Sequence, residues 1–203
     1  IIMNLNECTK YTEPFLRYEF ENCFEDTLIN EINNIIQNNE HEKIEDKYDG
    51  KRTDNKKRCF IDKNFIDKNK QYIYLQKLID YLQKDNVIHF FEKIGSIDLK
   101  NCYLRVEIIL DKHNFWLEKH KDIVEKKVSF LIYINDNDED LKNGTDLYDK
   151  NLKLVHSIPF KHNLGYVFFP NNDTWHGLEK GKNIKYRKCV LINYVTFKTD
   201  FKL

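Results

Sequence analysis

The sequence is poor in the residues and segments that mark several classes of protein. Glycine (6) and proline (3) are scarce among its 203 residues, which excludes collagen-like and low-complexity chains. The 5 cysteines are odd in number, scattered and without a CxxC pair, so a disulfide framework or a thiolate zinc site is not expected. No apolar run approaches the roughly 20 residues that a membrane-spanning helix needs. We therefore expect a cytoplasmic protein with no membrane partner.

An excess of charge of either sign is also absent. Lys and Arg total 33, Asp and Glu total 33, and the formal net charge is zero. Without a global basic field, nucleic acid is not expected as a partner. Hydrophobic residues make up 41% and aromatic residues 14% of the chain, which is typical of a globular protein with a substantial core. The length fits one domain, so we predict a single domain over residues 1–203 of undetermined oligomeric state.

The first half of the chain reads mainly as helices. Apolar residues recur at helical spacing over 25–38 and again over 70–94, where Asp85 and Asn86 break the pattern into two helices. A short strand is predicted at 14–23. Residues 1–98 are thus expected to form a helical N-terminal extension, with a long, lid-like loop over 39–69.

The pattern changes after Gly95. Alternating apolar residues predict strands at 101–110, 127–135, 145–149, 153–158, 165–169 and 188–197. Short strands separated by frequent turns are typical of a β-sandwich or barrel. The predicted fold class is α+β and mainly β, with a catalytic core at 99–203 and the N-terminal helices packed on it.

One constellation carries chemistry. His120 and Asp122 are two residues apart, so in extended structure both side chains point to the same face. His176 lies 56 residues further on, after a predicted strand and a turn. Two histidines and one carboxylate form a facial triad that holds Fe(II) and leaves coordination positions open. Arg187 follows His176 by 11 residues, and its planar fork suits a carboxylate.

With these intervals and strand contexts, the HKD…H…R arrangement resembles the Fe(II)/2-oxoglutarate-dependent dioxygenase superfamily, over about residues 100–197. The resemblance implies a double-stranded β-helix, or jelly roll, preceded by helices. It implies that His120, Asp122 and His176 are the catalytic metal ligands and that Arg187 binds the C5 carboxylate of 2-oxoglutarate. Fe(II), 2-oxoglutarate and O2 would be the cofactor and co-substrates, with succinate and CO2 as co-products.

The resemblance extends to weaker motifs. Asn101 and Tyr103 match a pattern in which the tyrosine hydroxyl touches 2-oxoglutarate, so both are expected at the cofactor. The stretch from Gly144 to Tyr148 (GTDLY) resembles a strand of small bacterial and phage-type members.

Candidate substrate-binding residues are Arg105, Glu107, Trp116, Trp175 and Arg58. The first two share a strand face, and the tryptophans flank the metal motifs. Both charges at a barrel mouth would suit a small molecule such as a free amino acid or a similar zwitterion. The alternatives are a structural ion pair, core packing of the tryptophans, and a solvated basic loop.

Other functions stay open. A cupin-like metal-binding isomerase or a non-catalytic jelly-roll binding protein would share the fold, although two histidines, one aspartate and Arg187 argue against both. Hydroxylation of a protein side chain is a third alternative. Release of succinate from 2-oxoglutarate would separate the oxygenase from the first two.

Overall fold

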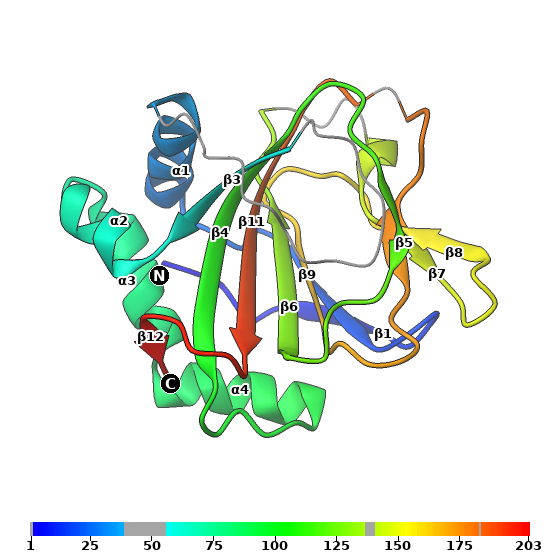
Figure 1. Ribbon diagram of the computed structural model, residues 1–203, viewed down its shortest axis with the longest axis horizontal. Helices are drawn as coiled ribbons and strands as arrows, with labels where there is room; N and C mark the ends of the chain where they lie inside the picture. Colours follow the sequence, from blue (N-terminus) through cyan, green and yellow to red (C-terminus); the bar gives the residue numbers. More distant parts are fainter. Residues whose placement is uncertain (1, 39–55, 137–140, 183) are drawn as a thin grey trace.

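The computed structural model describes residues 2–38, 56–136, 141–182 and 184–203, and in these it shows two antiparallel sheets and four α-helices (Figure 1). The major sheet has eight strands, in the order β1-β2-β9-β6-β11-β4-β12, with β3 also paired to β4. These strands are β1 (Cys8–Tyr11), β2 (Arg17–Phe20), β3 (Lys56–Ile61), β4 (Tyr103–Asp111), β6 (Lys126–Tyr133), β9 (Gly165–Phe168), β11 (Arg187–Val195) and β12 (Phe201–Lys202).

The minor sheet has four strands in the order β5-β10-β7-β8. They are β5 (Leu117–His120), β7 (Asp146–Tyr148), β8 (Leu154–Ser157) and β10 (His176–Leu178), and a single 3-10 turn, Leu141–Asn143, precedes β7. Figure 1 shows this sheet on one side of the major sheet and the helices on the other. The expected jelly-roll core with N-terminal helices is therefore confirmed.

The helices are α1 (Asp26–Asn38), α2 (Lys63–Lys68), α3 (Ile73–Leu82) and α4 (Asp85–Gly95). The predicted break between the last two is present, because the extended backbone of Lys84 (φ −71°, ψ 139°) separates α3 from α4. None of the helices in the described part of the chain has the length and apolar character to cross a bilayer.

Alternation along the major sheet gives it two different faces. In β4, Val106 and Ile108 pack into the large core beneath the helices, whereas Ile109 belongs to the core between the sheets. The same period of two places Ile192 of β11 against the helices and Leu191 between the sheets. Because both faces are covered, polar residues on the inner face lie in a protected space between the sheets.

The sequence prediction missed several short strands. Residues 56–61 and 63–68 were predicted as part of a loop but form β3 and α2. Three cationic residues open β3 and hide its alternation, and only Arg58 and Ile61 in it are buried. β1, β10 and β12 have four, three and two residues, too few for a periodic signal. The rest of the predicted lid, 39–55, lies outside the described residues.

Candidate active site

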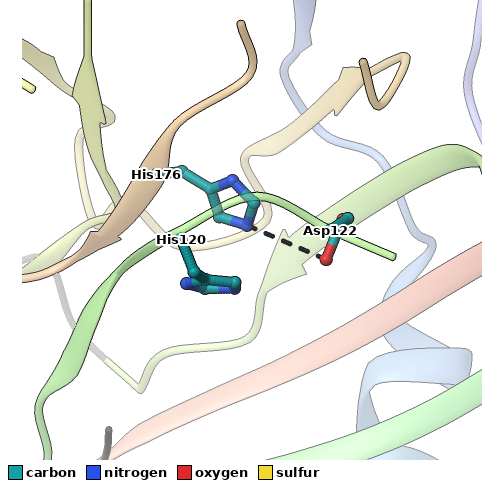
Figure 2. A group of neighbouring side chains, drawn as sticks. All are labelled: His120, Asp122 and His176. Atoms are coloured by element: carbon teal, nitrogen blue, oxygen red, sulfur yellow. Dashed lines mark ion pairs between the residues drawn. The ribbon is translucent and has the colours of Figure 1, made fainter. Parts of the chain in front are cut away.

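Two neighbouring strands of the minor sheet, β5 and β10, bring the predicted metal ligands together. His120 ends β5, Asp122 lies two residues beyond it, and His176 begins β10. β5 and β10 pair in antiparallel register with His176 directly opposite His120. One donor atom from each of the three residues lies within 4.8 Å of the others (Figure 2). Two ligands roughly 2.1 Å from one ion are at most about 4.2 Å apart, so small rotations bring all three onto a shared ion.

Backbone carbonyls fix the orientation of both imidazoles. His120 Nδ1 lies 2.9 Å from the carbonyl oxygen of Glu118, and His176 Nδ1 lies 2.9 Å from that of Thr174. A carbonyl oxygen only accepts, so each Nδ1 carries the hydrogen and donates it. Each Nε2 therefore keeps its lone pair, and that of His176 faces Asp122 Oδ1 at 4.0 Å (Figure 2). This is the outer-shell arrangement that metal-binding histidines typically have.

Electrostatics favour the protonation states that a cation needs. Burial, together with the nearby His176, lowers the pKa of His120 to about 3, so the imidazole is neutral at physiological pH. Burial likewise lowers the pKa of His176. Burial alone would raise the pKa of Asp122, but Lys126 and the histidines hold it below its usual range, and the carboxylate is ionised.

Lys126 is the present partner of Asp122. Its Nζ donates to Asp122 Oδ1 at 2.9 Å, and both side chains are nearly buried. The other oxygen, Asp122 Oδ2, is buried and has no hydrogen-bond partner among the described residues. An unsatisfied, ionised carboxylate oxygen beside two imidazole lone pairs fits a divalent cation and is costly without one.

A cavity of about 720 Å³ between the sheets opens beside the triad. Its walls include the three metal-site residues, inner-face residues of the major sheet, and Arg187. Arg187 is 6% exposed and begins β11, directly opposite Asp111. Its Nε donates to Asp111 Oδ2 at 3.1 Å, and Nη1 donates to the carbonyl of Asn143 at 2.9 Å. Burial alone would lower the pKa of Arg187, but the Asp111 carboxylate holds it above its usual range.

Hydroxyl groups lie near the same end of the cavity. Tyr166 donates to Thr145 Oγ1 at 2.8 Å, Tyr133 lies 2.9 Å from the same oxygen, and the backbone N–H of Thr145 donates to the Tyr133 hydroxyl. The guanidinium of Arg187 sits 5.8 Å from the centre of the Tyr133 ring. Thr145 and Tyr166 line the cavity, so this end combines a cation with hydroxyl groups.

The structure does not place Asn101 and Tyr103 at the cavity. Asn101 is exposed, and Tyr103 is at the opposite end of β4 from Asp111, opposite Val195. Eight residues of strand correspond to about 27 Å. The alternation that puts Tyr103 on the face of Arg105 is right, but the position along the strand does not suit contact with a ligand held at Arg187. The expected cofactor contact from these two residues therefore needs correction.

The candidate substrate residues divide in the same way. Arg58, Arg105 and Trp175 line the cavity, whereas Glu107 and Trp116 do not. Glu107 is 0% exposed and forms ion pairs with Arg58 at 2.6 Å and Arg105 at 2.9 Å.

Three functional candidates escaped the sequence interpretation: Lys126, Asp111 and Thr145. Asp111 lies on the same strand face as Arg105 and Glu107, and that spacing was a usable signal. Thr145 lies in the GTDLY stretch noted in the sequence, but that resemblance indicated no role for its hydroxyl. Lys126 carried no signal, because its partner is set by how the two sheets pack.

Comparisons with known proteins show likeness in structure only. No protein-family model matches the chain, and no curated protein does. A Pseudomonas putida prolyl-4-hydroxylase superposes with a TM-score of 0.62 over 90% of this chain and 93% of its own, at 12% identity. A Trichoplax adhaerens prolyl hydroxylase, solved with a peptide of a hypoxia-inducible factor, gives 0.61 over 89% and 83%, at 16% identity.

A Burkholderia pseudomallei protein of the 2OG-Fe(II) oxygenase family gives a TM-score of 0.50 over 71% of this chain and 67% of its own, at 11% identity. The fold of this chain is thus that of the Fe(II)/2-oxoglutarate oxygenases. Two prolyl hydroxylases match the fold over 90% and 89% of this chain.

Proposed function

We propose that this chain is an Fe(II)- and 2-oxoglutarate-dependent oxygenase that hydroxylates an organic substrate. One observation carries the proposal: two neutral imidazoles and an ionised carboxylate converge on the wall of a cavity that also holds a buried arginine. The shared fold supports it, since the resemblance of the HKD…H…R arrangement and the structural likeness point to the same superfamily.

His120, Asp122 and His176 would hold the iron. With 2-oxoglutarate and O2, bound Fe(II) supplies oxidation of a substrate C–H bond, releasing succinate and CO2. The chain supplies ligand orientation through the carbonyls of Glu118 and Thr174. It also covers one side of His176 with the Phe168 ring, whose centre lies 5.0 Å from the centre of the imidazole.

Arg187 would anchor the far carboxylate of 2-oxoglutarate. Two of its five N–H groups are committed to Asp111 and Asn143, which leaves three to donate. The hydroxyls of Thr145 and Tyr166 are further polar groups on the same wall and replace Asn101 and Tyr103 as proposed co-substrate contacts.

The other end of the cavity is the proposed substrate site. Arg105 is six residues from Asp111 on β4, about 20 Å along the strand. Its guanidinium is held by Glu107 and lies 4.7 Å from the centre of the Phe60 ring. Glu107 is fully buried between two guanidiniums, so it offers no carboxylate to a substrate ammonium. We therefore no longer require an ammonium group on the substrate. We propose a substrate with an anionic group that pairs with Arg105.

The cavity volume of about 720 Å³ is in the range of small-molecule sites, roughly 300–1,000 Å³. A protein side chain is the second candidate, favoured by the peptide complex of the Trichoplax prolyl hydroxylase. A small molecule with an anionic group and a peptide with an acidic residue near the target would both satisfy Arg105. Succinate formation in the presence of each class separates them.

The test is anaerobic addition of Fe(II) and 2-oxoglutarate to the metal-free protein. A weak visible charge-transfer band is expected, absent in His120→Ala and weakened in Arg187→Met. His89→Ala is the matched control, because His89 is an exposed residue of α4 outside the cavity. Metal binding without a band, or a band that survives His120→Ala, would leave a metal-binding jelly-roll protein as the better account.

A further inference from the structure

The arginine proposed to anchor 2-oxoglutarate is already neutralised. Arg187 and Asp111 are 6% and 1% exposed, face each other across β11 and β4, and form an ion pair at 3.1 Å. Both side chains line the cavity. A cationic anchor that faces no carboxylate would present a full positive charge to an incoming dicarboxylate, whereas this pair presents none.

The second carboxylate oxygen of Asp111 adds to the unfavourable environment for an incoming carboxylate. Oδ1 is buried and has no hydrogen-bond partner among the described residues. An unsatisfied carboxylate oxygen in a cavity wall repels another carboxylate and attracts a hydrogen-bond donor. A dicarboxylate that reaches Arg187 must therefore share one guanidinium with Asp111 in a partly desolvated space.

We propose that Asp111 is a specificity-determining residue that weakens the binding of dicarboxylic 2-oxo acids at Arg187. This inference rests on the proposed function. Asp111 sets the affinity for 2-oxoglutarate below what the buried arginine alone would give. It also reduces the preference for 2-oxoglutarate over 2-oxo acids that lack the far carboxylate.

The substitution that tests this is Asp111→Asn, which keeps an oxygen to accept from Arg187 Nε and removes only the charge. The protein is loaded with Fe(II) without oxygen and titrated calorimetrically with 2-oxoglutarate and with 2-oxopentanoate. The second ligand has the same chelating end and no far carboxylate. We expect Asp111→Asn to bind 2-oxoglutarate about tenfold or more tightly and to leave 2-oxopentanoate unchanged.

The matched control removes the carboxylate that pairs with Lys188, the residue after Arg187 in the chain. Asp136 pairs with Lys188 at 2.8 Å, next to Arg187 in the chain, but its side chain is 49% exposed and it does not line the cavity. Asp136→Asn should change neither affinity. Asp111→Ser is a second uncharged variant, used where unfolding curves show that Asp111→Asn does not fold; it should also tighten 2-oxoglutarate alone.

The results of these titrations distinguish failure of this inference from failure of the proposed function. Weaker or unchanged 2-oxoglutarate binding in the Asp111 variants would overturn the inference and make Asp111 a residue that only orients Arg187. Equal changes for both ligands would also overturn it, because they would indicate a general change of the cavity. If the unaltered protein and every variant bind Fe(II) but neither 2-oxo acid, the proposed function fails as well.

Discussion

Replacing Lys126 with methionine tests whether this lysine occupies the place of the metal ion. Lys126 Nζ and Asp122 Oδ1 are 2.9 Å apart, with side chains 12% and 8% exposed. At an effective dielectric constant near 20, unit charges at 2.9 Å attract by about 6 kcal/mol. Desolvation offsets part of this, and breaking a buried pair typically costs about 3–5 kcal/mol. We expect Lys126→Met to destabilise the metal-free protein by an amount in that range.

The same substitution should strengthen metal binding. The ammonium both holds an oxygen of Asp122 and repels a divalent ion, so its loss removes a competitor. We expect the dissociation constant for Mn(II), used as an oxygen-stable substitute for Fe(II), to fall about tenfold or more. Urea unfolding with chelator gives the first quantity, and calorimetric titration gives the second.

A surface pair provides the control for both measurements. Lys161 and Glu21 are also 2.9 Å apart, but their side chains are 43% and 64% exposed. Such pairs contribute roughly 0–1 kcal/mol, so Lys161→Met should change little. Weaker Mn(II) binding in Lys126→Met would refute the competition argument and show that Lys126 positions the carboxylate for the metal.

Three further outcomes are expected. Because burial lowers the pKa of His120 to about 3, the unfolded chain binds its proton first; the metal-free protein should lose stability as pH falls from about 6.5 to 4.5. As the pH falls, the urea midpoint measured in chelator should decrease less steeply in His120→Gln than in the parent protein. An equal decrease in both would contradict this. Gly144→Ala should lose stability and 2-oxoglutarate affinity, since a Cβ there would collide with the carbonyl of Ile158; unchanged unfolding and titration curves would count against it. Tyr194→Phe should cost about 1–3 kcal/mol, because the buried Leu82 carbonyl loses the hydroxyl that donates to it at 2.6 Å; a urea midpoint equal to that of the parent would disprove this.

The pairing of His120 with Asp122 in the candidate site was predictable from sequence because the two residues are near neighbours. His176 follows the predicted strand 165–169, whose alternation is clear, and Arg187 directly precedes the predicted strand 188–197. The helices 25–38 and 70–94 were predictable because their apolar faces are long and regular. The jelly-roll class followed from the count and length of strands after Gly95 together with the resemblance.

The position of a residue along its strand, relative to the end that reaches the cavity, was not predictable. Alternation assigned Tyr103 to the correct face of β4. The register between β4 and β11, however, places Tyr103 opposite Val195 and Asp111 opposite Arg187. A period of two identifies a face and carries no information about which end of the strand reaches the ligand. The role of Lys126 was hidden for a related reason, because it depends on where the chain turns between Asp122 and β6.

The two halves of the candidate site come from different sheets. The histidines lie on the minor sheet, and Arg187 and Asp111 lie on the major sheet. Lys126 of β6 pairs with Asp122, and Phe168 of β9 packs against His176, so the major sheet also contacts the candidate metal site. A ligand held by both sheets stabilises their packing, by about 2.7 kcal/mol at a concentration one hundred times its dissociation constant. We therefore expect the affinity of the proposed site for metal to be linked to the stability of the sandwich. Substitutions that loosen the packing of the two sheets should weaken metal binding without changing any of the three proposed ligands.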